Sequence, residues 1–394
     1  MSNSLMKTYA RLPVAFKSGK SVYLTDTEGN EYLDALCGIA VCSLGHAHPD
    51  IADAIADQAR TLIHTSNLYE IPNQTELSEK LCHLSGMGQV FFANSGAEAN
   101  EAAIKLARLF GKQQGIEKPV IIVATGSFHG RTLATLSATG NPKIQDGFDP
   151  LVEGFVHVPY NDIIAIKEVA INNPNVVAIL VEPVQGEGGV IVPDSDYLSN
   201  IRQICNENNW LMMLDEIQTG IGRTGKWFAF QHSENSKPDV MTLAKALGNG
   251  VPIGACLASG KANDVFSPGK HGTTFGGNPL AMRAALTVLH IIETQNLCNN
   301  AGNMGKYLVD QFKQSLSDDK GLIDGVSDIR GHGLMIGIEL EKDCAELVVQ
   351  ALDYKILINV TADRTIRLLP ALITTKEQAD KIINTVSILV KTFL

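Results

Sequence analysis

The chain has 394 residues, a length at which a single hydrophobic core usually gives way to two domains. Hydrophobic residues make up 45% of it, which is enough to form a substantial core. The net charge of −10 argues against a protein dedicated to binding nucleic acid or an acidic membrane surface.

Cysteine usage and apolar runs indicate the compartment. The seven cysteines contain no Cys-x-x-Cys pair, which predicts free thiols rather than disulfides or a zinc site, so we expect no bound metal. No apolar run approaches the ~18 residues that would span a bilayer, and residues 1–16 lack the apolar stretch of a signal peptide. We therefore expect a cytoplasmic protein without a membrane partner.

Between residues 50 and 285, short apolar runs alternate with longer stretches of helical period. This alternation predicts a parallel sheet with crossover helices. The runs are continuously apolar, as in strands that are covered on both faces; they comprise residues 90–93, 120–124, 176–181, 210–214, 240–244 and 253–258. Several runs end in polar clusters, and ligands of open α/β sheets bind beyond the carboxyl ends of the strands. We expect these clusters to converge on one site.

The two ends of the chain have a different pattern. Short strand-like pieces flank a Gly29-Asn30 turn, which is a hairpin signal. Helical stretches at 279–294 and 299–317 precede apolar segments at 333–340, 355–360 and 365–370, and an amphipathic helix is expected at 376–394. We predict a large domain of residues 50–285 and a smaller α+β domain of residues 1–49 and 286–394.

The first motif, Asn-Ser-Gly-Ala-Glu-Ala-Asn-Glu at residues 94–101, follows a predicted strand and opens a helix. Ser95 and Glu98 have the spacing of a capping box. Gly96 lets the backbone approach a ligand closely, and the free N–H groups of a first helical turn suit a phosphate. A well-capped helix without a ligand explains the same residues, and on this motif alone it is the better explanation.

Residues 126–132, Gly-Ser-Phe-His-Gly-Arg-Thr, lie just past the strand predicted at 120–124. The ring of Phe128 could stack on a heteroaromatic ring, and the guanidinium of Arg131 could bind a carboxylate through two hydrogen bonds. A surface loop with a solvated arginine is equally compatible with this segment.

Residues 182–189, Glu-Pro-Val-Gln-Gly-Glu-Gly-Gly, follow the strand predicted at 176–181. Two carboxylates beside an apolar strand need partners unless they stay in water. Glu182 and Glu187 are therefore candidates to project into a cleft, and an exposed turn is the equally weighted alternative.

Asp215 comes directly after the apolar run 210–214, so its carboxylate is held at the edge of a dry core. A buried carboxylate needs a cation, and a protonated pyridine nitrogen would serve. Such a pairing makes the pyridine ring an electron sink. Gln218 could then hydrogen-bond a ring hydroxyl. The alternative is a structural ion pair between Asp215 and Arg223.

Lys245 follows the run 240–244, thirty residues after Asp215. Lysines are mostly solvated surface groups. The apolar neighbours at positions 243, 244, 246 and 247 should remove part of the hydration of this one, which would lower its pKa and raise its nucleophilicity. Gly248 and Gly250 leave room for a bulky adduct.

Two further features lie in the C-terminal half. Residues 271–279 form a loop rich in hydroxyls and glycines, in which Thr273 and Thr274 could donate hydrogen bonds to an anion. Arg367 is a lone charge between apolar residues. Such a charge usually snorkels or has a structural partner, but an arginine at a domain interface is also suited to bind a carboxylate.

Taken jointly, these motifs resemble the class III (ornithine-type) aminotransferases nearly end to end, from LPVAF and GHAHP to RLLPALI. NSGAEANE, FHGRT, VEPVQGEGG, LDEIQTG, LAKALGNG and HGTTFGGNPLA occur in the order and spacing of that family. The resemblance implies an α/β protein of the pyridoxal-phosphate-dependent transferase fold type I, with a mostly parallel seven-stranded sheet in the large domain. It also implies a homodimer with the active site at the subunit interface.

The resemblance also implies residue roles around the cofactor, pyridoxal 5′-phosphate. Lys245 would carry it as a Schiff base and then act as general base and acid. Asp215 would pair with the pyridine nitrogen, Gln218 would contact the ring hydroxyl, and Phe128 would stack on the ring.

The same resemblance assigns residues to the phosphate. The amides of Gly96 and Ala97 would bind it, joined by Thr274 of the partner subunit.

Within the family, the likeness is greatest to members that transfer the 5-amino group of N2-acetylornithine to 2-oxoglutarate in arginine biosynthesis. Arg131 and Thr273 would bind substrate, with Arg131 holding the carboxylate of acetylornithine and later the distal carboxylate of 2-oxoglutarate. Arg367 would hold the α-carboxylate of the oxoacid, and Glu187 would cover this arginine during the amine-donor half-reaction. Ile39 stands where ornithine-specific relatives carry a tyrosine, which favours an N-acylated donor.

Several alternatives stay open at this point. The donor could be succinylornithine, ornithine, 4-aminobutyrate, or an acylated lysine or diaminopimelate precursor. The same scaffold could run an aminomutase or racemase reaction, or the chain could be a regulatory protein that binds the cofactor without catalysis.

Overall fold

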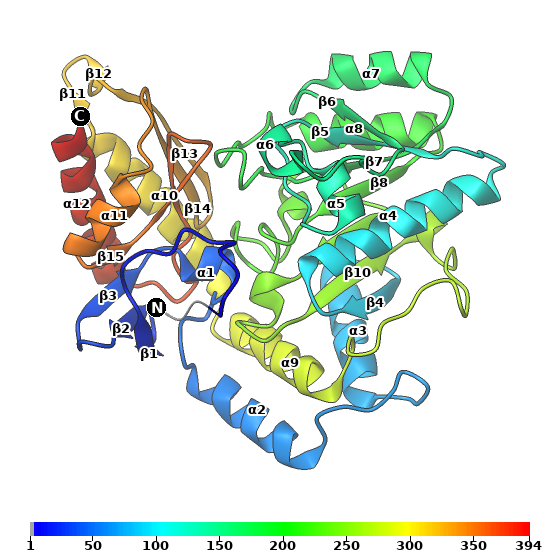
Figure 1. The fold of residues 1–394 in the computed structure, drawn as a ribbon, viewed down its shortest axis with the longest axis horizontal. Helices are drawn as coiled ribbons and strands as arrows, with labels where there is room; N and C mark the ends of the chain where they lie inside the picture. The colour runs from blue at the N-terminus through cyan, green and yellow to red at the C-terminus, as the bar shows by residue number, and fades with distance from the viewer. Residues whose placement is uncertain (1–3) are drawn as a thin grey trace.

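The computed structural model describes residues 4–394, and a seven-stranded sheet forms the centre of its larger part (Figure 1). The strand order is β4-β10-β9-β8-β7-β5-β6. The strands are β4 (Gln89–Ala93), β5 (Val120–Ala124), β6 (Phe155–Val158), β7 (Val176–Val181), β8 (Leu211–Asp215), β9 (Val240–Leu243) and β10 (Gly254–Ala258). The five strands from β9 to β6 run parallel. This confirms the predicted mostly parallel, seven-stranded sheet.

Both faces of this sheet are covered, which explains why its strands are continuously apolar. Alternate residues of the central strands belong to two separate hydrophobic clusters, one packed with α4 (Gly96–Gln113) and the other with α8 (Tyr197–Glu207). Further helices of this part are α2 (Pro49–Thr61), α3 (Pro72–Ser85), α5 (Leu133–Ala138), α6 (Pro142–Gln145), α7 (Ile163–Asn172) and α9 (Pro279–Thr294).

Two details of the sheet depart from the pattern of apolar runs. β6 was not predicted, because it is an edge strand and its segment is only partly buried. β10 forms as predicted but runs antiparallel to both β4 and β9. The connection from β9 to β10 spans only residues 244–253, which is too short for the crossover of about a dozen residues that a parallel pair requires.

The smaller part, on the left of Figure 1, joins the two ends of the chain. One antiparallel sheet has the order β13-β14-β17-β16, and a second has the order β1-β2-β3-β15, in which β15 pairs in parallel with β3. Its strands are β1 (Phe16–Lys20), β2 (Tyr23–Asp26), β3 (Glu31–Asp34), β11 (Ser317–Asp318), β12 (Gly321–Leu322), β13 (Val326–His332), β14 (Met335–Leu340), β15 (Ile356–Leu357), β16 (Asn359–Thr361) and β17 (Thr365–Leu368). The helices are α1 (Cys37–Ala40), α10 (Leu297–Ser315), α11 (Leu347–Asp353) and α12 (Lys376–Phe393).

The local signals at the two ends of the chain correspond to real elements. β2 and β3 form the expected hairpin, with Gly29 at φ +95° in its turn. The helix expected at 299–317 begins two residues earlier, at Leu297, and ends at Ser315. The domain boundary expected at residue 285 falls inside α9, which packs on α2 and α3, so the division into two domains stays a prediction. No helix of residues 4–394 is both long and apolar enough to cross a membrane.

Candidate active site

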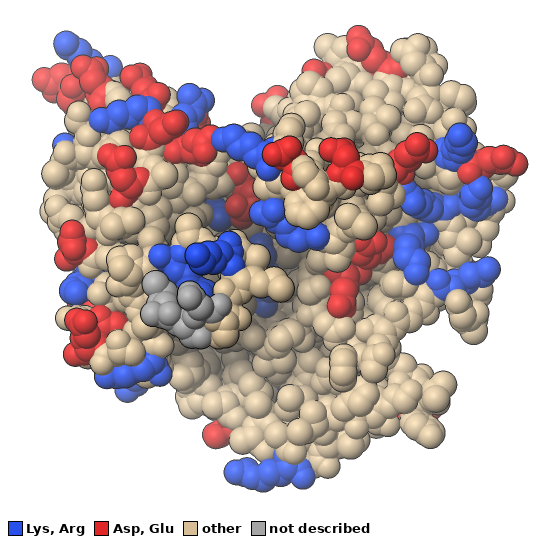
Figure 2. Space-filling model, viewed as in Figure 1, with Lys and Arg blue, Asp and Glu red and all other residues tan. Residues whose placement is uncertain are grey.

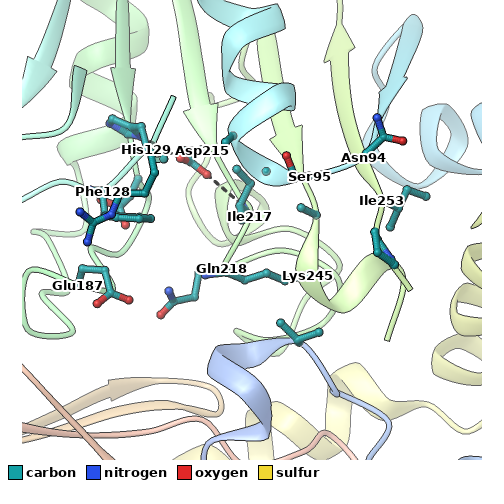
Figure 3. Close-up of a pocket in the computed structure, with 18 of the residues that line it drawn as sticks. Asn94, Ser95, Phe128, His129, Glu187, Asp215, Ile217, Gln218, Lys245 and Ile253 are labelled. Atoms are coloured by element: carbon teal, nitrogen blue, oxygen red, sulfur yellow. Dashed lines mark hydrogen bonds and ion pairs between the residues drawn. The ribbon is translucent and has the colours of Figure 1, made fainter. Parts of the chain in front are cut away.

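A cavity of about 400 Å³ lies where polar residues follow β4, β7, β8 and β9, between the sheet and the loop after α1 (Figure 3). The polar clusters that follow the strands in the sequence predict such a convergence. Most of the predicted site residues line this cavity; they are Gly96, Ala97, Phe128, Arg131, Glu187, Asp215, Gln218 and Lys245.

Asp215 is a buried carboxylate at the end of β8 that accepts hydrogen bonds from donors on three segments. Asn100 Nδ2 on α4 lies 2.7 Å from Oδ2, His129 Nδ1 lies 2.8 Å from the same oxygen, and the amide of Ile217 donates to Oδ1 at 3.1 Å. Thr242 donates to Asn100 Oδ1 at 2.8 Å and so orients the amide. Because His129 Nε2 is buried and has no partner among residues 4–394, the geometry fits a neutral ring with its proton on Nδ1.

The alternative partner for Asp215, Arg223, is elsewhere. Arg223 is fully buried and donates to the carbonyls of Leu334 and Pro370 at 3.1 and 2.5 Å and to Ser43 Oγ at 2.8 Å. No lysine or arginine of the described residues forms an ion pair with Asp215. The predicted structural pair is therefore wrong, and the carboxylate keeps a negative charge that a cationic ligand could match.

Lys245 follows β9, the strand next to β8, and adopts the left-handed conformation with φ +45°. Burial lowers the pKa of its ammonium, as expected from its apolar neighbours; nearby Glu187 and Asp215 raise that pKa and Arg367 lowers it. Figure 3 shows Lys245 and Asp215 entering one cavity from these neighbouring strands. An amine that sheds its proton more readily is a better nucleophile.

The N-terminus of α4 borders the same cavity. Ser95 Oγ caps the helix by accepting from the amide of Glu98 at 3.2 Å, which leaves the amides of Gly96 and Ala97 without that acceptor. The Glu98 carboxylate reaches the amide of Asn94 at 2.7 Å rather than that of Ser95, so the predicted capping box is shifted by one residue. A Cβ atom on Gly96 would lie 2.8 Å from the Ile217 side chain, which would have to shift to admit it.

Glu182, at the end of β7, is buried and accepts hydrogen bonds from the amides of Phe128 and Gly186, both at 3.1 Å. Burial raises the pKa of its carboxyl to about 7, and the charge of Asp215 adds to this effect. The alternative of an exposed turn is thus wrong for Glu182. Its carboxylate instead binds the backbone amide of Phe128 and so holds that residue in place.

Glu187 and Arg367 form an ion pair at the edge of the cavity. Arg367 Nη1 lies 2.6 Å from Glu187 Oε1, and Nη2 lies 2.7 Å from Asn359 Oδ1. Arg367 is 1% exposed, whereas the Glu187 side chain is 34% exposed. Gln218 Oε1 is 3.5 Å from the same Nη1, a distance that contributes little.

Arg131 has the opposite character. Its side chain is exposed at the cavity, and its guanidinium carbon lies 5.8 Å from the centre of the Phe128 ring. It forms no ion pair within residues 4–394, so its charge is available to an anionic ligand.

Thr273 and Thr274 lie outside this cavity. Thr273 Oγ1 accepts from Asn94 Nδ2 and from the amide of Gly276, both at 3.2 Å, and Thr274 is exposed. Asn67 donates to the carbonyl of Thr273 at 3.3 Å, so the loop packs against the segment that follows α2.

Sequence reasoning missed Asn100, His129 and Asn359. Asn100 and His129 lie 115 and 86 positions along the chain from Asp215, whose carboxylate they bind. Asn359 lies on β16, directly opposite Arg367 of the neighbouring strand β17. The only sequence signal for Asn100 is its position next to the apolar stripe of α4. A side chain exposed to solvent would account for that position equally well.

The residues of this cavity fit one cofactor. A buried carboxylate that no described lysine or arginine pairs with complements a protonated ring nitrogen. An amine after the next strand complements an aldehyde, and the helix N-terminus complements a phosphate. The fold and the site define a pyridoxal-5′-phosphate-dependent aminotransferase of fold type I. The family model of class III aminotransferases matches residues 5–390, and the chain belongs to this family.

Individual relatives agree with this family. An acetylornithine aminotransferase of Nitrosomonas europaea is 57% identical over 99% of this chain and 98% of its own length. That of Aquifex aeolicus is 48% identical over 96% of this chain and 98% of its own. Among solved structures, the ornithine aminotransferase of Toxoplasma gondii has a TM-score of 0.94 at 33% identity, covering 99% of this chain and 93% of that one. The acetylornithine aminotransferase of Elizabethkingia anophelis has a TM-score of 0.86 at 34% identity, covering 98% and 96%.

The hydrogen bond from Asn100 to Asp215 gives a first prediction. Asn100→Leu keeps the side-chain volume and removes the donor, so the carboxylate should be held less firmly as an anion. We expect the dissociation constant of pyridoxal 5′-phosphate to rise roughly 10- to 150-fold, the effect of losing a hydrogen bond to a charged group. The measurement is an absorbance titration of the apoenzyme.

Thr242→Val is the control for this variant, because it removes the hydroxyl that orients Asn100 but leaves every donor to Asp215 in place. Its effect should be smaller. Wild-type cofactor affinity in Asn100→Leu would contradict the assignment.

Proposed function

We propose that the chain transfers the 5-amino group of N2-acetylornithine to 2-oxoglutarate, giving N-acetylglutamate 5-semialdehyde and glutamate in arginine biosynthesis. The observation that carries this proposal is the unequal pair of arginines at the cavity. Arg131 has no carboxylate partner within residues 4–394, and Arg367 is paired with Glu187. The 57% identity to an acetylornithine aminotransferase over nearly the full chain supports the choice of donor.

We propose that the cofactor is held by residues on three segments. The amides of Gly96 and Ala97 bind the phosphate, Phe128 stacks on the ring, Asp215 pairs with the ring nitrogen, and Gln218 contacts the ring hydroxyl. Supporting this assignment, all of them line the cavity.

Lys245 binds the cofactor covalently through Nζ. Pyridoxal 5′-phosphate, when bound, supplies an aldehyde that condenses with amines and a ring that takes up the electron pair left at the reacting carbon. Once the substrate amine has displaced Nζ from the aldehyde carbon, the freed Lys245 amine would accept a proton from the carbon that bears the substrate amine. It would then donate that proton back, acting first as general base and then as general acid. The lowered pKa of Lys245 supports this role, because a neutral amine is needed to accept the proton.

The amine donor has no carboxylate on its reacting carbon. Arg131 binds its carboxylate at the far end. Glu187 keeps Arg367 neutralised in this half-reaction, so the site does not favour an α-amino acid bound the wrong way round.

The oxoacid does carry a carboxylate on its reacting carbon. Glu187 leaves Arg367, which binds this α-carboxylate, and Arg131 binds the distal one. The partial exposure of Glu187 supports such a movement, because the side chain can turn into solvent.

We also propose a cytoplasmic homodimer in which Thr274 of the partner subunit contributes to the phosphate site. An exposed apolar patch supports this assembly. Segments 62–69 and 273–276 lie together, since Asn67 donates to the carbonyls of Thr273 and Gly276. They expose Leu62, Ile63, Leu68, Tyr69 and Phe275. The α2–α3 loop is largely uncharged on the face in Figure 2. The seven free cysteines support the cytoplasmic location, because thiols stay reduced in that compartment.

The decisive experiment adds substrates one at a time to the holoenzyme. N2-acetylornithine should bleach the aldehyde chromophore, and 2-oxoglutarate should restore it. kcat/KM should be highest for acetylornithine when it is compared with succinylornithine, ornithine and 4-aminobutyrate. Ornithine is the second candidate because of the Toxoplasma gondii structure, and a preference for free ornithine would overturn the proposal.

Lys245→Ala removes the amine that binds the cofactor. We expect loss of the yellow, borohydride-reducible chromophore and a fall in turnover of at least roughly 10²–10⁴-fold, the range for general acid–base catalysis alone. Absorbance and steady-state rates measure both effects. Lys226→Ala, outside the cavity, should behave as wild type. Near-normal turnover of Lys245→Ala would refute the role of this lysine.

The dimer gives a separate prediction. Leu68 and Tyr69 are 86% and 69% exposed, so the double variant Leu68→Glu with Tyr69→Glu should place buried charges in the interface and produce monomers in sedimentation experiments. It should also retain the cofactor less well. Ile171→Glu is the control, because Ile171 is 83% exposed on α7, away from this patch. A double variant that stays dimeric would rule out this interface.

A further inference from the structure

Arg367 is held by two hydrogen-bond partners, one negatively charged and one neutral. On β17 it is paired in register with Gly337 of β14 on one side and with Asn359 of β16 on the other. Its Nη1 binds the Glu187 carboxylate at 2.6 Å, and its Nη2 binds Asn359 Oδ1 at 2.7 Å. The Asn359 contact involves the oxygen of the amide, because a guanidinium only donates.

The two partners also differ in how they are attached. Asn359 belongs to a strand and is half-buried. Glu187 belongs to the loop after β7, but the Thr361 hydroxyl of β16 donates to its carbonyl, so its backbone is tied to the strand that carries Asn359. Only the Glu187 side chain, 34% exposed, is left to move. When this side chain turns away, the hydrogen bond that Arg367 donates to Asn359 remains.

The charge of each partner decides what remains at the site after this movement. Glu187 neutralises the guanidinium while it is bound, whereas an amide accepts the hydrogen bond without cancelling the positive charge. An unanchored, buried guanidinium would be free to change its orientation at a cost in substrate affinity. A permanent carboxylate at position 359 would keep Arg367 neutralised in both half-reactions.

We propose that Asn359 is a positioning residue that sets the specificity for the acceptor. It keeps Arg367 aimed at the cavity, with its charge uncompensated, when Glu187 has moved away. It therefore makes the α-carboxylate of the oxoacid recognisable without affecting the amine donor. This inference rests on the role of Arg367 in the proposed function.

The test uses Asn359→Asp, which preserves shape and adds a charge. The holoenzyme in its pyridoxamine form is reacted in single turnovers with 2-oxoglutarate and, separately, with succinic semialdehyde, which lacks only the α-carboxylate. We expect kcat/KM for 2-oxoglutarate to fall roughly 10- to 100-fold, as for loss of a hydrogen-bonded charge pair. The rates with succinic semialdehyde and with acetylornithine should stay within about 2-fold of wild type, below the effect of one hydrogen bond.

Two more variants make the result decisive. Asn359→Leu is neutral but lacks the acceptor, so it should also lose selectivity for 2-oxoglutarate over the semialdehyde, and it tests the anchor if Asn359→Asp fails to fold. Asn175→Asp adds the same charge at an exposed loop position and should not change the ratio. An unchanged ratio of the two acceptors, or equal losses with both, would overturn the proposal.

The pyridoxamine form is prepared directly from the apoenzyme and pyridoxamine phosphate. The acceptor ratio is therefore measured without acetylornithine. If the wild type failed to use acetylornithine yet Asn359→Asp lost its selectivity for 2-oxoglutarate, the proposed donor would be wrong and the role of Asn359 would stand.

Discussion

The site depends on a buried carboxylate that has no lysine or arginine partner in the part of the chain that the structure describes. Asp215 at the end of β8 is held by Asn100 from α4, by His129 from the loop after β5 and by the amide of Ile217. These neutral donors reduce the cost of burying the charge but do not cancel it. Three segments far apart in sequence must therefore meet at one point of the sheet, and the charge they hold matches a protonated ring nitrogen.

Two arginines tie together the backbone where the two parts of the molecule meet. Arg330 of β13 donates to the carbonyls of Gly189 and Val190 at 2.6 and 2.8 Å. Arg223 donates to the carbonyls of Leu334, just before β14, and Pro370, just after β17. Burial lowers the pKa of Arg223 to about 10. Its hydrogen bonds offset part of the free-energy cost of burying the charged guanidinium. Backbone on both sides of the cavity is thus held by hydrogen bonds, whereas the Glu187 side chain is 34% exposed.

The sequence predicts the parts of this structure whose cause is local. Asp215 and Lys245 follow strands covered on both faces, so continuous apolarity located both. β6 and β13 are edge strands that are only partly buried, so they have no continuous apolar run and were not predicted from the sequence. The direction of β10 depends on the length of its connection to β9. The hydrogen-bond partners of Arg223 include a carbonyl next to β14, far away in the sequence, so no local motif predicts either feature. Asn100, His129 and Asn359 are defined by contacts across the fold, which periodicity in a single segment cannot reveal.

The pairing of Arg367 also explains how one cavity could serve two different substrates at low energetic cost. Removing one partner of a fully buried ion pair typically costs about 3–5 kcal/mol, because the remaining charge is left uncompensated. The cost is lower for the pair of Arg367 and Glu187, because solvent screens the glutamate, which is 34% exposed. In the proposed cycle this state is short-lived, since the α-carboxylate of the oxoacid replaces that of Glu187 while the glutamate turns into solvent. One carboxylate is exchanged for another, and the guanidinium stays hydrogen-bonded to Asn359 throughout. Selectivity then comes from uncovering a fixed charge rather than from building a second binding site.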